Sequence, residues 1–187
     1  RNLDSEHMVG TLLGNIGLAH FWQGQYDKAM EYYQRGLAIA RKLGKEDRVA
    51  IFLGSIGLIY KSSGKYDKAI EHYKQALAIS RKLGNVYVTT TALNNLGTLL
   101  VYFGNYDKAL DFFTEALTLY RKLETEEEVA LTLSNISAVF YLQGQYVSAI
   151  KYLKESISLI EKLRKTAADD ARRDYLASQI ANYETLI

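Results

Sequence analysis

Histidines and carboxylates are the side chains of this sequence best suited to acid–base or metal chemistry. The three histidines, His7, His20 and His72, stand at unrelated positions, and none has a hydroxyl or carboxylate at a spacing typical of a catalytic site. Cysteine is absent, which removes disulfides, thiolate nucleophiles and cysteine-ligated zinc from consideration. We therefore expect no enzyme activity and no cofactor.

The densest acidic cluster is Glu126, Glu127 and Glu128, which on paper attracts a cation. Consecutive carboxylates at a helix start more often stabilise the positive end of the helix dipole, so we predict no metal site. The glycines recur with a fixed period and do not form a phosphate-binding loop. Nucleotide binding is therefore not supported.

Composition limits the class of protein. The chain has 187 residues with 48% apolar content, which fits a single folded domain over residues 1–187. The net charge is only +2 and the basic residues are dispersed, so a mixed-charge surface is expected and nucleic acid is not a predicted partner. The pairs Arg41-Lys42, Arg81-Lys82 and Arg121-Lys122 are expected in the last turns of helices, where the helix dipole favours cations. A basic ridge formed by these pairs, facing an acidic partner, remains a secondary hypothesis.

Targeting segments are also not evident. No apolar run reaches the roughly 18 residues that a membrane-spanning helix needs, so no membrane insertion is expected. The first eight residues lack the pattern of a signal peptide. We expect a cytoplasmic protein, and a domain cut from a longer chain.

Internal repetition is the strongest feature of the sequence. The tetrad Tyr-Asp-Lys-Ala begins at Tyr26, Tyr66 and Tyr106, and a weaker copy begins at Tyr146, so the period is 40 residues. Two further columns keep this period: Gly24, Gly64, Gly104 and Gly144, then Leu43, Leu83, Leu123 and Leu163. Four repeats are predicted, at about 4–44, 45–84, 85–124 and 125–164.

Each repeat divides at its glycine into two amphipathic segments, A and B, and proline is absent, so every repeat is expected to be a helical hairpin. In the A segments one face forms the packing seam, with Leu13, Ile16, Gly17 and His20 in the first repeat and Leu53, Ile56, Gly57 and Tyr60 in the second. The small residues of this seam are best explained by close helix approach, because a mid-helix glycine costs about 0.5–1 kcal/mol relative to alanine. The B segments carry a structural stripe, such as Ala69, Tyr73 and Ala76.

These columns resemble the tetratricopeptide repeat family. The resemblance implies an all-α, right-handed superhelical solenoid of four helical hairpins. Family repeats are usually about 34 residues long, and the 40-residue form is similar to the repeats of kinesin light chains, Pins-type adaptors and bacterial or archaeal signalling proteins. The usual closing proline is missing, and Gly44 and Gly84 are expected to end the second helices instead.

The last residues suggest a cap. Leu176, Ala177 and Ile180 lie one period after Ile136, Ser137 and Phe140, which predicts an unpaired fifth A helix at about 167–187. Its polar face would cover the end of the stack, as terminal repeats of solenoids do.

The resemblance implies a concave surface lined by the A helices, and this is where we expect a partner protein or peptide. A turn of roughly 100° from the seam selects the candidate groove residues. They are Leu18, Phe21 and Trp22, then Leu58 and Lys61, then Asn94, Thr98, Val101 and Tyr102, and finally Ala138 and Tyr141. Gly14, Gly54, Ser62, Ser134 and Leu142 lie on the same faces.

The chemistry of this groove is mainly apolar and aromatic, with Lys61 as its only charge. Chaperone-binding family members grip a terminal carboxylate with several basic residues, and no such clamp is evident here. Pins-type adaptors carry an asparagine ladder where this chain has Leu18, Leu58, Thr98 and Ala138. We therefore predict a scaffold that binds an amphipathic helix or an extended apolar peptide.

Three alternatives stay open. Phe21 and Trp22 would be core residues if an upstream helix covered them. The groove would otherwise serve a homo-oligomer, because exposed apolar patches often mark such interfaces. The repeats would also suit a regulatory or sensory module attached to an enzyme or a DNA-binding domain elsewhere in a longer chain.

Overall fold

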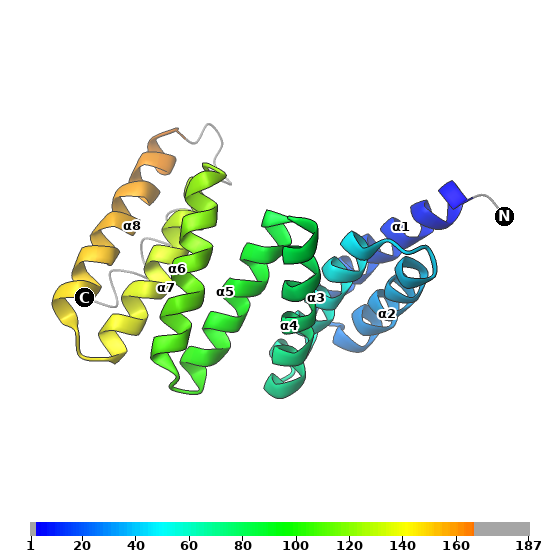
Figure 1. Ribbon diagram of the computed structural model, residues 1–187, viewed down its shortest axis with the longest axis horizontal. Helices are drawn as coiled ribbons and strands as arrows, with labels where there is room; N and C mark the ends of the chain where they lie inside the picture. Colours follow the sequence, from blue (N-terminus) through cyan, green and yellow to red (C-terminus); the bar gives the residue numbers. More distant parts are fainter. Residues whose placement is uncertain (1–2, 167–187) are drawn as a thin grey trace. The chain divides into compact units, whose positions relative to one another are not determined.

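The computed structural model describes residues 3–166 of the chain. This part holds eight helices and no strand, which confirms the all-α repeat fold (Figure 1). The helices are α1 (Leu3–Trp22), α2 (Tyr26–Lys42), α3 (Glu46–Ser62), α4 (Tyr66–Leu83), α5 (Val86–Tyr102), α6 (Tyr106–Lys122), α7 (Glu126–Leu142) and α8 (Tyr146–Thr166). The predicted capping helix, with Leu176, Ala177 and Ile180, lies outside the described residues. None of the eight helices is both long and apolar enough to cross a membrane.

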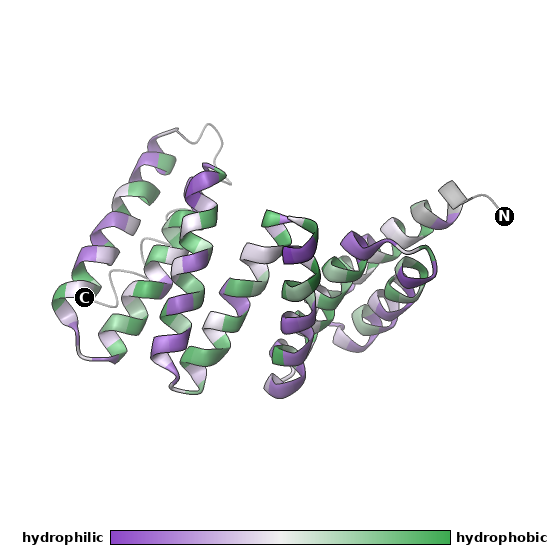
Figure 2. Ribbon diagram, in the orientation of Figure 1, coloured by the Kyte–Doolittle hydropathy of each residue, from purple (hydrophilic) through white to green (hydrophobic). Residues whose placement is uncertain are grey.

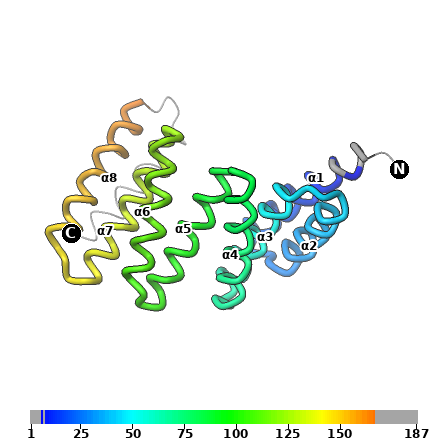
Figure 3. The backbone as a smooth tube through the Cα atoms, in the orientation of Figure 1, coloured from blue at the N-terminus to red at the C-terminus, as the bar shows by residue number. Residues whose placement is uncertain are grey.

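Contacts between Cα atoms group the chain into two compact units, residues 1–99 and 100–187, here called the first unit and the second unit. In the first unit α1 packs on α2, α2 packs on α3, and α3 packs on α4. In the second unit α6 packs on α7, and α7 packs on α8. Figure 3 shows the short turn that joins α7 to α8. Each unit is described by itself.

The B helices are amphipathic, as the sequence predicts. In Figure 2 hydrophilic and hydrophobic residues alternate along α2 and α4. Helix α4 has Asp67 in its first turn and Arg81 and Lys82 in its last turn, where each charge is favoured by the helix dipole. Gly84 then ends α4 in the left-handed conformation, as predicted, and the N–H of Asn85 donates to the carbonyl of Ser80 at 2.9 Å.

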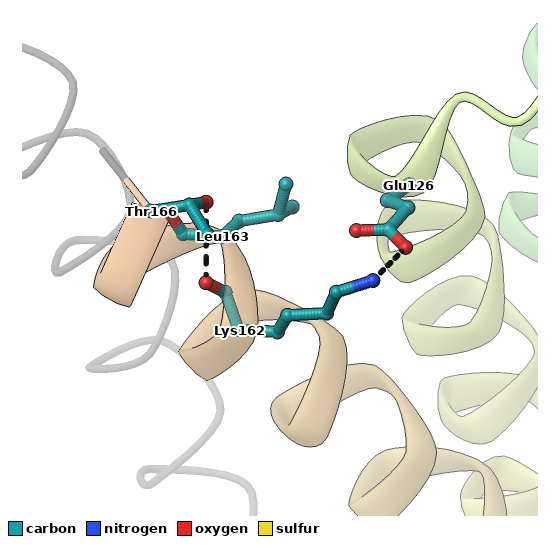
Figure 4. Close-up of polar contacts among 4 residues, drawn as sticks. All are labelled: Glu126, Lys162, Leu163 and Thr166. Carbon is teal, nitrogen blue, oxygen red and sulfur yellow. Dashed lines mark hydrogen bonds and ion pairs between the residues drawn. The ribbon is translucent and has the colours of Figure 1, made fainter. Parts of the chain in front are cut away.

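Three ion pairs, here called the ladder, each join the A helix and the B helix of one hairpin: α1 with α2, α3 with α4, and α7 with α8. Lys42 binds Glu6 at 2.8 Å, Lys82 binds Glu46 at 3.1 Å, and Lys162 binds Glu126 (Figure 4). Lys42 ends α2, Lys82 is the last residue but one of α4, and Lys162 lies four residues before the end of α8. Each glutamate lies in the A helix that precedes its lysine, 36 residues earlier. Sequence reasoning explained Glu126, Lys42 and Lys82 by helix dipoles alone and missed these ion pairs. Two of the pairs engage lysines of the hypothesised basic ridge, Lys42 and Lys82.

One column of the B helices fills the core between paired helices. It contains Tyr33, Tyr73, Phe113 and Leu153, all buried. The tyrosine rings lie against glycines of the facing A helix: a Cβ atom at Gly17 would lie 2.7 Å from the ring of Tyr33, and a Cβ atom at Gly57 would lie 2.8 Å from that of Tyr73. Close approach therefore explains these two seam glycines, as predicted.

The seam is less covered in α1 than in the other A helices. Ile16 is 41% exposed, whereas Ile56 and Ile136 in the same column are each 2% exposed. Helix α3 has α2 packed against it, and α7 has α6 packed against it, in addition to their own hairpin partners. Helix α1 is the first described helix, so the predicted burial of Ile16 does not occur in the described part of the chain.

Candidate functional site

The predicted groove residues are divided between the two units. Seven of them belong to the first unit, and the second unit holds four, Val101, Tyr102, Ala138 and Tyr141. The structure therefore provides two local surfaces, and each contains one apolar pocket with at least one predicted residue.

The first-unit pocket lies between α3, α4 and α5 and has a volume of about 250 Å³. Leu58 is the predicted groove residue that lines it. The walls come from the A helices and the floor from the B helix, and the main lining residues are Ile51, Gly54, Ser55, Leu58, Tyr73, Ala76, Val88, Thr91, Ala92 and Asn95.

A hydrogen bond from Lys61 adds polarity beside this pocket. Its Nζ donates to Asn95 Oδ1 at 2.9 Å and so joins α3 to α5. Asn95 in turn donates through Nδ2 to the carbonyl of Thr91 at 3.0 Å. Burial lowers the pKa of Lys61 below the ordinary lysine value. The only charge in the predicted groove is thus held against an amide and does not project freely.

Tyr73 gives the floor of the first-unit pocket an unusual polar group. The residue is 1% exposed, and its hydroxyl has no hydrogen-bond partner within the described part of the chain. Burial raises its pKa, so the hydroxyl keeps its proton. Tyr33, one repeat earlier, instead shares a side-chain hydrogen bond with Ser55, which offsets part of the rise that burial causes in its pKa.

The second-unit pocket lies between α7 and α8 and is larger, with a volume of about 450 Å³. Its described lining carries no charged side chain, and consists of Ser134, Ser137, Ala138, Tyr141, Leu142, Tyr146, Ala149, Ile150 and Leu153. The rings of Tyr141 and Tyr146 meet at 5.7 Å between centroids. Ser137 donates its hydroxyl to the carbonyl of Ala149 at 2.8 Å, which leaves the pocket with an apolar floor.

The predicted residues of the first repeat, Leu18, Phe21 and Trp22, line neither of these two pockets. Leu18 is exposed and Trp22 is 77% exposed, whereas Phe21 is half-buried and packs against the core of the first unit. The rings of Phe21 and Trp22 meet edge to face at 5.5 Å. Phe21 thus has a structural role, and Trp22 projects from the surface in the described part of the chain.

The remaining predicted residues lie on α5. Thr98 donates its hydroxyl to the carbonyl of Asn94 at 2.9 Å, within the helix, and Asn94 is half-buried. In the second unit, Val101 is half-buried and Tyr102 is exposed, with its ring 5.4 Å from that of Phe103. None of these four is among the residues that line the two pockets.

Sequence reasoning missed the floors of both pockets. Tyr73 and Leu153 were assigned to a purely structural stripe, but each also lines a pocket. Asn95 was missed because it lies one position after the selected Asn94, and Ile51 and Thr91 were missed because they lie one helical turn before the selected residues. The repeat period could have indicated these residues. Where two helices of a pocket wall lie apart, the B-helix column that contains Tyr73 and Leu153 forms the surface between them.

The histidines show no catalytic arrangement in the described residues. His20 stacks on Tyr32 at 5.3 Å in the seam between α1 and α2, and its Nδ1 lies 2.9 Å from Gln25 Oε1. The Nδ1 of His72 donates to the carbonyl of Lys68 at 2.8 Å. The side chain of His7 lies outside the described part. No group of three or more His, Asp or Glu residues in this part could hold a metal ion.

Comparison with protein families gives one clear match. The tetratricopeptide repeat model matches residues 8–82 and 88–162, which together make up most of the chain. A search of curated protein sequences finds no match.

Several solved structures share the fold. BtubC from P. vanneervenii aligns with a TM-score of 0.76 and 21% identity, over 88% of this chain and 68% of that one. The apo form of RapI aligns with a TM-score of 0.79 and 18% identity, over 95% and 70%. A Rap protein complexed with Competence and Sporulation Factor aligns with a TM-score of 0.71 and 21% identity, over 82% of this chain and 43% of that protein.

Proposed function

Since the chain belongs to the tetratricopeptide repeat family, we propose that it is an interaction scaffold that binds an apolar segment of a partner protein or peptide. The two pockets are the proposed contact points, each within its own unit. The Rap protein of similar fold, whose structure is a complex with Competence and Sporulation Factor, supports this class of function.

The observation that carries the proposal is the concentration of exposed apolar side chains at the second-unit pocket. Tyr141, Leu142, Tyr146 and Ile150 line one cavity, and about half of each side chain is exposed. Contiguous apolar surface of this kind marks interaction sites, because water contact with it is unfavourable. Aromatic residues are also enriched among those that dominate binding energy.

The proposal includes the absence of catalysis by this chain. His20 and His72 are engaged in stacking and hydrogen bonds that hold the helices, and no thiol exists to act as a nucleophile. An enzyme needs a base, a nucleophile or a bound metal at hydrogen-bond distance from its substrate. A module of this kind would regulate or position other proteins.

Self-association is the second candidate, favoured by the same exposed side chains. In that case a second copy of the chain would cover the second-unit pocket, and a partner peptide would compete with dimer formation. A regulatory module within a longer protein is compatible with either candidate.

The test starts from peptides selected on this chain from a random phage-displayed library. We expect the selected peptides to carry large apolar side chains and to bind by calorimetry. Leu58→Asp with Tyr141→Ala, one substitution in each pocket, should weaken binding by about 30-fold or more, which corresponds to about 2 kcal/mol. Gln34→Asp, on the exposed side of α2, introduces the same charge away from both pockets and should bind normally.

Equal affinity of the wild type and the double variant, with both folded, would remove the proposed surface. A change from dimer to monomer in light scattering caused by these substitutions would support self-association instead. Circular dichroism and the melting temperature of each variant separate lost binding from lost folding.

A further inference from the structure

The hydroxyl of Tyr73 is a buried donor that the described protein does not use. Buried polar groups in folded proteins nearly always have a hydrogen-bond partner, because an unpaired one loses its contact with water and gains nothing in return. Tyr73 also lines the first-unit pocket, so the side chain that carries the unpaired group forms part of the cavity wall. A ligand in this pocket could supply the missing acceptor.

The preceding repeat shows how the protein satisfies such a hydroxyl when it does so itself. Tyr33 occupies the same column as Tyr73 and shares a hydrogen bond with Ser55. The position equivalent to Ser55 in the next repeat is Asn95, whose amide is engaged by Lys61 at 2.9 Å and by the carbonyl of Thr91 at 3.0 Å. Asn95, which stands where Tyr73 would find the equivalent of Ser55, thus has its amide group bonded to other residues.

The ring that carries this hydroxyl is held in one place. A Cβ atom at Gly57 would lie 2.8 Å from Cε1 of the Tyr73 ring, so the ring fills the space that the glycine leaves. Ala76, on the same helix, is fully buried beside the pocket. A fixed donor adds more to binding than a mobile one, because its conformational entropy has already been lost.

The lining of the pocket defines the chemistry of its ligand. The walls at Ile51, Leu58, Val88 and Ala92 are apolar, and no charged side chain is among the described lining residues. A carboxylate would lose its hydration there without meeting a cation, whereas a neutral carbonyl has a much smaller desolvation cost. A volume of about 250 Å³ is below the usual range for drug-sized ligands and suits one large side chain.

We propose that the first-unit pocket binds one aromatic or branched aliphatic side chain of a partner peptide, and that the Tyr73 hydroxyl donates a hydrogen bond to a neutral carbonyl oxygen of that same segment. This inference rests on the proposed function, since the pocket is one of its two contact points. It adds the class of group recognised and the residue that recognises it.

The experiment uses N-acetyl-L-phenylalaninamide, which carries an aromatic side chain and two neutral carbonyls. It is titrated into the full 187-residue chain, labelled with ¹⁵N. We expect saturable shifts of the amide signals of Val88, Thr91 and Ala92. Tyr73→Phe, which removes only the hydroxyl, should weaken binding about fivefold to tenfold. Tyr33→Phe removes the paired hydroxyl of the neighbouring repeat and should leave the affinity unchanged.

Three results would overturn the inference: equal affinity of wild type and Tyr73→Phe, equal weakening by Tyr33→Phe, or no saturable shift at the pocket. A bound water that holds the Tyr73 hydroxyl in the probe complex would overturn it as well. The proposed function fails separately, because it is tested by Leu58→Asp with Tyr141→Ala on selected peptides. Peptides that lose affinity to that double variant but not to Tyr73→Phe would refute the hydrogen bond alone.

Discussion

The first-unit and second-unit pockets are built on the same repeat columns, two repeats apart, and differ in the side chains placed there. The floor is Tyr73 in one and Leu153 in the other. The groove charge Lys61 has Tyr141 as its counterpart. The first pocket therefore combines a smaller cavity with an unpaired hydroxyl and a nearby cation, and the second is larger and uncharged in its described lining.

The floor residue and the seam residue opposite it vary together. Gly57 leaves room for the ring of Tyr73, whereas Ser137 in the same column faces the smaller Leu153 and donates a hydrogen bond to Ala149. The packing of each hairpin is thus maintained by a small seam residue paired with a large floor residue, or by a larger seam residue paired with a smaller floor residue. The chemistry of the pocket depends on which of these pairs the repeat contains. A scaffold of nearly identical repeats can in this way offer different binding sites.

The largest expected effect comes from placing the second-unit seam residue in the first unit. Gly57→Ser should destabilise the protein by about 1–3 kcal/mol, because the new Cβ atom would lie 2.8 Å from the Tyr73 ring. Combining it with Tyr73→Leu, which imports the whole second-unit pair, should recover part of that loss. Urea unfolding of the two single variants and the double variant measures the coupling.

Gly54→Ser is the matched control for this prediction. A Cβ atom at Gly54 meets no described atom within 4 Å, and Ser134 is the natural residue of that column in the second unit. Its stability should change little, or rise by a few tenths of a kcal/mol from helix propensity. Strictly additive losses for Gly57→Ser and Tyr73→Leu would show that the two residues are not a matched pair.

The hydroxyl that distinguishes the first-unit pocket leads to the second prediction. Tyr33→Phe should cost about 1 kcal/mol, because it removes a hydrogen bond shared with Ser55. Tyr73→Phe should be neutral or slightly stabilising, because it removes a buried hydroxyl that has no partner in the described protein. Denaturant unfolding compares the two. Equal losses would reveal a partner for Tyr73, such as a bound water.

The repeat fold was predictable from the sequence because the residues that start and end its helices recur with the 40-residue period. Tyr66, Asp67 and Ala69 start a helix and Gly84 ends one; the start pattern occurs in three of the four repeats and the closing glycine in two. The lining of the pockets was only partly predictable. Leu58, Ala138 and Tyr141 were predicted correctly as lining residues. Their selection needed only the angle between two faces of a single helix, which can be derived from the spacing of residues in the sequence.

The rest depends on distances between helices, which the helical period does not contain. The contribution of Tyr73 to a pocket depends on how far apart α3 and α5 lie, and its unpaired state depends on the side chain of Asn95 bonding to Lys61. The exposure of Ile16 likewise does not follow from its column, since Ile56 and Ile136 in the same column are buried. The placement of the groove residues as one binding surface stays a prediction.

Turns between repeats offer a third comparison between the units. Gly84 ends α4 at φ 67°, and Glu124 in the same column of the second unit adopts φ 56° without being glycine. A side chain in this left-handed region is strained by about 1–2 kcal/mol. Glu124→Gly should stabilise the protein by about 0.5–1 kcal/mol, since the greater flexibility of unfolded glycine offsets part of the gain.

Thermal unfolding of Glu124→Gly measures this effect, and Gly84→Ala is its reciprocal. The alanine variant should be destabilised by about 1 kcal/mol, because it introduces into the first unit the strain that Glu124 carries in the second. The hydrogen bond that closes each turn agrees with this difference. The N–H of Asn85 lies 2.9 Å from the Ser80 carbonyl, whereas that of Thr125 lies 3.3 Å from the carbonyl of Tyr120. A Glu124→Gly variant less stable than the wild type would contradict the assignment of strain.

The smallest expected effect concerns a feature that both units share. Lys82 pairs with Glu46 in the first unit and Lys162 pairs with Glu126 in the second, and the four side chains are between 36% and 70% exposed to solvent. Glu46→Gln and Glu126→Gln should each cost no more than about 0.5 kcal/mol at low salt, because solvent and side-chain entropy offset most of the attraction. Both losses should shrink in about 1 M salt, where charges are screened within about 3 Å. Glu161→Gln, beside Lys162 on α8, controls for the change in net charge. Urea unfolding at the two salt concentrations decides: a loss above about 1 kcal/mol, or one that salt does not reduce, would mean that the ladder holds one unit together more strongly than exposed ion pairs can.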